Sequence, residues 1–147
     1  MEFQELFKES KGKPIIYKGK EVRGIDNIIL DKNEAKFRLR FISTKSEWEQ
    51  GIFIETKGHF EVNGKKIQNS IVLWDSTSPK EVDFFVNSKS KSILIYNAWK
   101  NRSGLTLYWY NGPAMIVSEN KNSRIYNCND GYPDDDFDDL IFELTEI

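Results

Sequence analysis

The residues with the clearest chemical potential lie in one acidic segment near the C-terminal end of the sequence. Six aspartates occur within residues 130–139, and the run includes Asp134, Asp136, Asp138 and Asp139. Ca²⁺ takes six to eight oxygen ligands, which clustered carboxylates and backbone carbonyls supply. Closely spaced carboxylates also raise one another's pKa unless a cation neutralises them. The segment therefore predicts a site for one divalent cation, with these four aspartates as its ligands.

The donor types in this segment select the metal. Residues 129–139 contain oxygen donors and no histidine or cysteine, which favours Ca²⁺ or Mg²⁺ over zinc or copper. The number of carboxylates favours Ca²⁺, because it tolerates crowded coordination better than octahedral Mg²⁺. The segment is not an EF-hand, because a loop of that type beginning at Asp134 would place Leu140 and Thr145 at ligand positions.

Charge is distributed unevenly along the sequence. Residues 129–147 contain eight acidic residues and no basic one, whereas residues 1–128 contain 21 basic and 15 acidic residues. An acidic block is usually a disordered tail, but this one contains Phe137 and leads into an apolar alternation, which predicts a folded loop. Two other ways of offsetting the repulsion stay open: ion pairs with Lys or Arg of a neighbouring strand, and exposure to water.

The acidic pattern resembles a known calcium loop. Asp134-x-Asp136-Phe137-Asp138-Asp139, followed by an apolar strand, resembles the motif D-x-D-[FY]-[ND]-D of certain β-sandwich calcium-dependent lectins. It is also similar to a motif in calcium-binding β-sandwich modules of secreted bacterial proteins. The match covers about ten of the 147 residues, and Asp138 stands where asparagine is common. The resemblance implies that the four aspartates bind Ca²⁺ and that sugar hydroxyls coordinate the ion.

Other candidate ligand contacts lie beside the acidic run and on one aromatic segment. Asn129 and Asp130 stand at the start of the acidic segment, and three residues separate Asp130 from Asp134. Within residues 105–110 the alternation places Tyr108 and Tyr110 on one face, which could stack on sugar rings or form a protein-binding hot spot. The alternative is that other layers and loops cover both faces of this strand. Three tryptophans are interpreted as core or edge packing: Trp48, Trp74 and Trp99.

No motif predicts catalysis. His59 is the only histidine and Cys128 the only cysteine, and neither stands in a pattern that supplies the partners of a triad or a zinc site. The sequence lacks a Walker loop, GxGxxG and GxSxG. We therefore predict that the protein is not an enzyme and that Cys128 is a small buried hydrophobe. A glycoside hydrolase with two carboxylates is disfavoured, because the acids are concentrated in one loop.

The elements that must position these residues are β-strands. A period of two predicts strands at residues 36–42, 51–55, 67–74, 82–87, 92–99, 105–110, 114–119 and 140–145. Asn63-Gly64 predicts a two-residue type I′ hairpin turn. Residues 1–10 are compatible with a short helix. No ten-residue helical period separates the strands, which excludes a parallel βαβ sheet.

We therefore predict a single domain over residues 1–147, an all-β antiparallel β-sandwich of jelly-roll type. A chain of this length buries roughly 68–70% of the surface of its unfolded state, so it needs no disulfide. In the last strand, Asp139 and Ile141 are expected on the face opposite the core residues. The predicted interior comprises Phe37, Leu39, Phe41, Leu107, Trp109, Leu140, Phe142 and Leu144.

The leading hypothesis is a non-catalytic binding module that binds Ca²⁺ through its acidic loop and a carbohydrate ligand beside it. One alternative is an immunity-like or inhibitor-like protein that docks its acidic end on a basic protein partner. Another is a calcium-dependent membrane module in which Asp75 joins the loop. We expect no membrane span, no nucleic-acid binding and a cytoplasmic default location, because Met1 is not followed by a signal-peptide pattern. Export without such a signal and the oligomeric state stay open.

Overall fold

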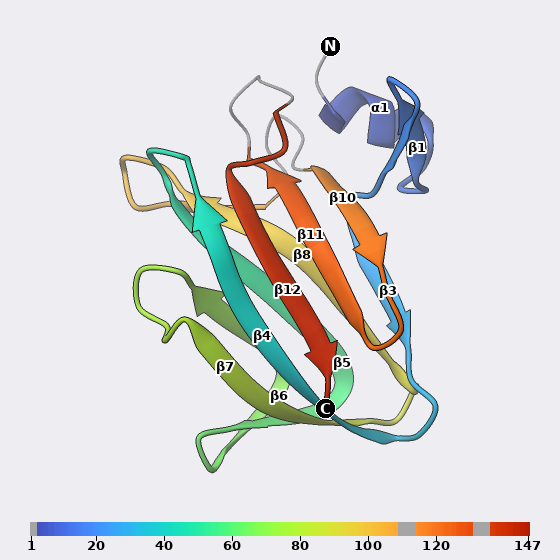
Figure 1. The fold of residues 1–147 in the computed structure, drawn as a ribbon, viewed down its shortest axis with the longest axis vertical. Helices are drawn as coiled ribbons and strands as arrows, with labels where there is room; N and C mark the ends of the chain where they lie inside the picture. The colour runs from blue at the N-terminus through green and yellow to red at the C-terminus, as the bar shows by residue number, and fades with distance from the viewer. Residues whose placement is uncertain (1–2, 109–113, 131–135) are drawn as a thin grey trace.

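The computed structural model describes residues 3–108, 114–130 and 136–147. One short helix is followed by strands throughout this part of the chain (Figure 1). The elements are α1 (Phe3–Glu9), β1 (Ile15–Tyr17), β2 (Lys20–Val22), β3 (Asp26–Ile29), β4 (Glu34–Thr44), β5 (Glu49–Val62), β6 (Lys65–Trp74), β7 (Glu81–Ser88), β8 (Ser92–Lys100), β9 (Thr106–Leu107), β10 (Ala114–Glu119), β11 (Ser123–Asn129) and β12 (Leu140–Glu146).

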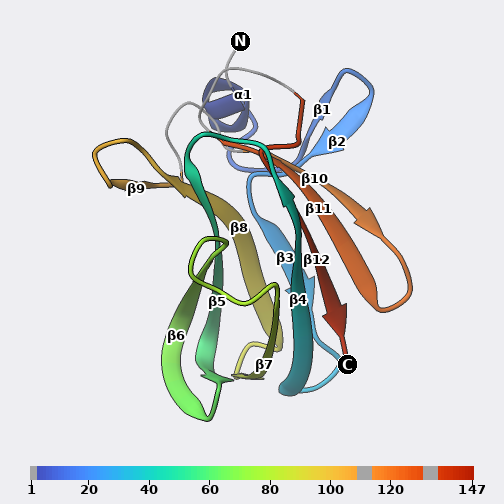
Figure 2. The same ribbon diagram turned by 60° about the vertical axis from the view of Figure 1, so that its left-hand side comes forward.

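One antiparallel sheet contains ten of these strands. Its path runs β10-β11-β12-β4-β7-β5-β8-β3, with β6 paired to β5 and β9 paired to β8, while β1 and β2 form a separate hairpin. The sheet bends so that β6, β5 and β8 face β4, β12 and β11 (Figure 2). This arrangement confirms the predicted all-β, antiparallel, sandwich-like fold and its short N-terminal helix. The described helix is not long or apolar enough to cross a membrane.

The long strand β5 passes from one layer to the other. Its residues 49–55 pair with β8, whereas residues 58–61 pair with β7. The change coincides with a register shift in its pairing with β6, between Glu55 and His59. Gly58 makes the change possible, because its φ is +155° and an added Cβ would lie 1.9 Å from the carbonyl oxygen of Asn87. A bulge at a sheet corner is a common way for a strand to change layers.

The strict alternation in β4 and β12 gives the main core. Six of the eight predicted interior residues are buried: Phe37, Leu39, Phe41, Leu140, Phe142 and Leu144. Leu107 is only half-buried, which corrects the prediction, because β9 has two residues and pairs with β8 alone. Trp109 lies outside the described residues. The Asn63-Gly64 turn has φ values of 52° and 77°, which confirms the expected hairpin.

A buried carboxylate joins β3 to the far end of the sheet path. The backbone of Arg23 pairs with Met115 of β10. Asp26, which is 1% exposed, accepts hydrogen bonds from Arg23 Nη1 at 2.6 Å, Arg124 Nη1 at 3.3 Å and the hydroxyl of Tyr126 at 2.6 Å. Burial raises the pKa of Tyr126, and the nearby carboxylate raises it further. These contacts hold the two edges of the bent sheet together.

Helix α1 and the β1–β2 hairpin cover one end of the sandwich. Phe3 and Val22 pack with Ala114 and Phe137 in a cluster separate from the main core. The rings of Phe3 and Phe137 meet edge-to-face at 5.5 Å. The N-terminal elements therefore anchor the segment that contains the described aspartates.

Candidate functional site

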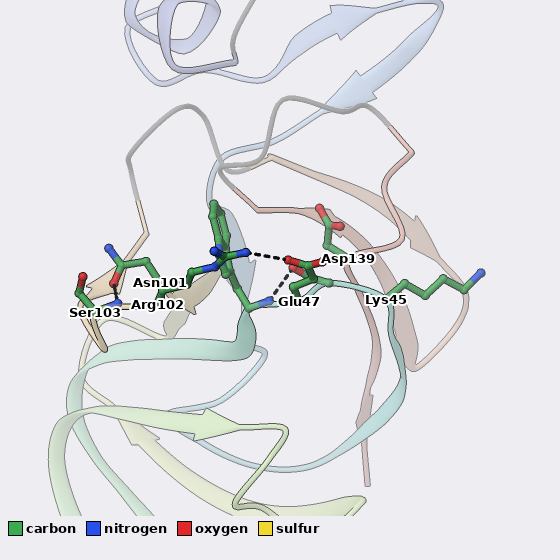
Figure 3. A pocket seen from close by; sticks show the side chains of 8 residues that line it. Lys45, Glu47, Asn101, Arg102, Ser103 and Asp139 are labelled. Atoms are coloured by element: carbon green, nitrogen blue, oxygen red, sulfur yellow. Dashed lines mark hydrogen bonds and ion pairs between the residues drawn. The ribbon is translucent and has the colours of Figure 1, made fainter.

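Three segments meet at the end of the sandwich that carries the acidic residues: the turn between β4 and β5, the turn after β8, and residues 136–139 before β12. They surround an open pocket of about 580 Å³ (Figure 3). Its lining residues are Lys45, Ser46, Glu47, Trp48, Asn101, Arg102, Ser103 and Asp139. This pocket is the candidate functional site.

Beneath the pocket, buried polar side chains form one hydrogen-bonded network. Asp130, 1% exposed, accepts hydrogen bonds from Ser46 Oγ at 2.6 Å and from Gln50 Nε2 at 3.0 Å. Its backbone N–H donates to Asp139 Oδ2 at 2.9 Å. Hydrogen bonds within a buried network restrict the side chains that they join, although Gln50 Oε1 has no partner among the described residues. The floor of the pocket is therefore fixed by contacts between β5, β11 and the segment before β12.

Asn129 fixes the position of the aspartate-rich segment through a hydrogen bond with Phe137. Its side-chain oxygen accepts the backbone N–H of Phe137 at 2.7 Å, and its carbonyl accepts Asn97 Nδ2 at 2.7 Å. Phe137 has a φ of +54°, in the left-handed region that costs a non-glycine residue about 1–2 kcal/mol. The hydrogen bond that the Phe137 N–H donates to Asn129 and the packing of the buried phenyl ring offset this strain.

Trp48 forms one wall of the pocket, and Trp99 lies behind it. The indole of Trp48 stacks on that of the buried Trp99, with ring centroids 6.3 Å apart and planes 11° apart. Gln50 Nε2 donates to the carbonyl of Trp48 at 3.1 Å. The ring of Trp48 is therefore held in place where it lines the pocket.

The described aspartates of the predicted calcium loop lie in different surroundings. Asp136 is exposed and lines another pocket with Lys18 and Lys20. The Asp138 carboxylate lies 3.8 Å from Lys45 Nζ. Asp139 was expected on the face opposite the core, but it is 5% exposed, because it turns inward to the backbone of residue 130 before the strand begins.

The calcium prediction is left open by these positions. Asp134 lies outside the described residues, and the residues that are described contain no group of three or more His, Cys, Asp or Glu side chains able to hold a metal. The ion pair between Lys45 and Asp138 is of the kind that the alternative interpretation expects, although pairs this exposed contribute only about 0–1 kcal/mol. Convergence of the four aspartates on one cation stays a prediction.

The predicted aromatic contacts lie elsewhere. Tyr108 is 46% exposed and packs against Phe53 and Tyr96, with ring centroids 5.6 and 5.7 Å away. It does not line the pocket. Burial raises the pKa of Tyr96, and its hydrogen bond to Glu55 raises it further. Tyr110 lies outside the described residues.

The lone histidine and cysteine lie on different strands. His59 is on β5, whereas Cys128 is on β11 and is fully buried. Burial raises the pKa of the Cys128 thiol, and the nearby Asp139 raises it further, so the nucleophilic thiolate is disfavoured. The expectation that Cys128 is a buried hydrophobe is confirmed.

Sequence reasoning missed most of the pocket. Trp48 was interpreted as packing, and Arg102 and Gln50 were not singled out. Only residues 101–104 carried a local sequence signal, that of a turn. This signal predicts a loop but does not show which other segments the loop contacts. No protein family model matches the chain, and neither a curated protein nor a solved structure matches it. What the pocket can do is therefore derived from its residues.

Proposed function

We propose that the protein is a non-catalytic binding module and that its ligand is a neutral polyhydroxylated molecule, a carbohydrate, bound in the pocket at the acidic end of the sandwich. The observation that carries the proposal is the wall formed by Trp48. Its ring is fixed by stacking on Trp99 and stands beside polar side chains in one open pocket. Aromatic faces and hydrogen-bonding groups together suit the two kinds of surface of a sugar ring.

The charges of the pocket favour a ligand without net charge. Lys45 and Arg102 carry two positive charges, and Glu47 and Asp139 carry two negative charges. Arg102 Nη2 lies 3.5 Å from Glu47 Oε2, and both side chains are 87% exposed (Figure 3). A weak exposed pair of this kind can exchange its partners for ligand hydroxyls at little cost. Balanced donors and acceptors therefore suit alcohols better than a strongly charged group.

The floor reduces the cost of binding. Ser46 and Gln50 already donate hydrogen bonds to Asp130. A ligand therefore meets a site whose buried part need not be ordered on binding, which preserves affinity. Asp139 belongs both to this pocket and to the predicted calcium ligands. If Ca²⁺ binds there, linkage requires that calcium and the sugar alter each other's affinity by the same factor.

A glycan array followed by calorimetry on the bound sugar tests the proposal. Trp48→Ala should weaken binding about tenfold through the loss of ring stacking. Arg102→Ala, at an exposed position, should weaken binding without changing the melting temperature. Trp74→Phe is the matched control, because this indole lies over Gly51 and outside the pocket. Full binding by Trp48→Ala, or an equal loss in the control, would contradict the proposal.

A further inference from the structure

A second concave surface lies where β5 is paired with β6 on one side and with β7 on the other. Figure 1 shows the β5–β6 hairpin at the bottom of the view and the start of β12 at the top. Its volume is about 540 Å³. The ionisable side chains that line it are all basic: Lys57, His59, Lys66 and Lys89. A concave surface lined by one sign of charge concentrates its electrostatic potential.

The β5 bulge creates this pocket. Glu55 pairs with Ser70 and His59 pairs with Gln68, so residues 56–58 stand opposite Asn69 alone. Asn69 has a φ of +68°, and Gly58 has a φ of +155°. The interruption separates the two strands and places the side chains of Gln68 and Asn69 at the pocket. The same backbone feature that lets β5 change layers therefore also forms the second pocket.

The three lysines keep their charges available. In the part of the chain that the structure describes, Lys57, Lys66 and Lys89 form no ion pair within 4.0 Å. Glu61 lies opposite Lys66 in the β5–β6 register, but the two side chains form no ion pair within 4.0 Å. By contrast, Arg38 of the neighbouring β4 bonds to a carboxylate at 2.7 Å.

Further hydrogen-bond donors complete the lining. The side chains of His59, Gln68 and Asn69 make no hydrogen bond to any described residue, so their N–H groups remain available to a ligand. The other amide in the pocket, Asn87, donates to Glu34 at 3.4 Å. The pocket therefore offers three cations and three uncommitted N–H donors within one concavity.

We propose that this pocket binds a tetrahedral oxyanion group, phosphate or sulfate. The ammonium groups of Lys57, Lys66 and Lys89 supply the charge, since lysine binds phosphate as a point charge. His59, Gln68 and Asn69 supply hydrogen bonds to the remaining oxygens. This site is separate from the carbohydrate pocket and does not depend on it, because the two share no residue.

The only histidine makes this site easy to observe. The ring protons of His59 give the only imidazole signals in a proton NMR spectrum. Sodium sulfate and sodium phosphate are titrated at fixed pH, and sodium chloride keeps the ionic strength constant. We expect a saturable shift of the His59 signals with both oxyanions. Lys66→Gln and Lys89→Gln should each weaken the affinity about tenfold, because each removes a charge-assisted hydrogen bond.

Lys121→Gln is the matched control, since this exposed lysine lies in the turn between β10 and β11 and outside the pocket. It should bind the oxyanions as the unaltered protein does. All three substituted side chains are exposed, so thermal melts of the variants should coincide. A shift that chloride alone reproduces, a titration that does not saturate, or an equal loss in Lys121→Gln would overturn the proposal.

Discussion

Gly58→Ala tests whether one glycine allows β5 to change layers. The new Cβ would lie 1.9 Å from the Asn87 carbonyl oxygen and 3.3 Å from the Cα of Ser88. Both obstacles are backbone atoms, so no rotation of a side chain can relieve the overlap. A left-handed φ costs an alanine about 1–2 kcal/mol, and overpacking against a rigid neighbour adds about 1–3 kcal/mol. We expect a loss of unfolding free energy of about 2–5 kcal/mol.

Gly64→Ala separates the two costs. Gly64 has a φ of +77° and nothing within 4 Å of its Cβ position, so it should lose only the conformational part, about 1–2 kcal/mol. Urea unfolding followed by tryptophan fluorescence gives both values. The slope should be unchanged, because the surface exposed on unfolding is the same. If Gly58→Ala costs no more than Gly64→Ala, the close approach at Asn87 does not restrict the corner and the reasoning is wrong.

Two further predictions concern buried and clustered carboxylates. Asp26→Ala should destabilise the fold by about 3–5 kcal/mol, because it leaves two arginines and the hydroxyl of Tyr126 without their buried partner. The control Asp83→Ala removes an exposed ion pair and should leave the urea midpoint nearly unchanged. Ca²⁺ at 100 times its dissociation constant should add about 2.7 kcal/mol of stability, EDTA should reverse the gain, and Asp136→Asn should abolish it. The first prediction is contradicted if Asp26→Ala loses as little stability as Asp83→Ala. The second is contradicted if calorimetry detects no heat of binding at millimolar Ca²⁺.

The fold was predictable from the sequence where one face of a strand is buried and the other is exposed to solvent. In β4 and β12 every second residue is apolar, and a slip by one residue would expose the whole set. β11 was missed because its alternation is blurred. Its inward residues Tyr126 and Cys128 alternate with Ile125, which is exposed, and Asn127, so neither face has a uniform character. The strand expected at residues 105–110 reduces to β9 in the described chain, because its only neighbour is β8.

The candidate site was predictable only in its location. The local run of aspartates indicates which segment carries the charge, and its last residue, Asp139, lines the pocket. The contacts that shape the pocket are not local: Asp130 bonds to Gln50 and Ser46, which are 80 and 84 positions away in the sequence. Periodicity cannot show which buried polar groups will meet across the sheet. The inward turn of Asp139 follows from such a contact and not from the strand pattern.

The described aspartates show how a folded segment tolerates this much charge. Asp136 shares its pocket with two lysines, Asp138 faces Lys45, and Asp139 accepts a backbone N–H. The three carboxylates thus lie in different surroundings, although they belong to one short segment around the buried Phe137. A cation that gathered Asp136 and Asp139 would have to draw together side chains that line separate pockets. Calcium binding would therefore require the segment to turn about Phe137, whose ring is packed against α1, and the environment of α1 would change with it.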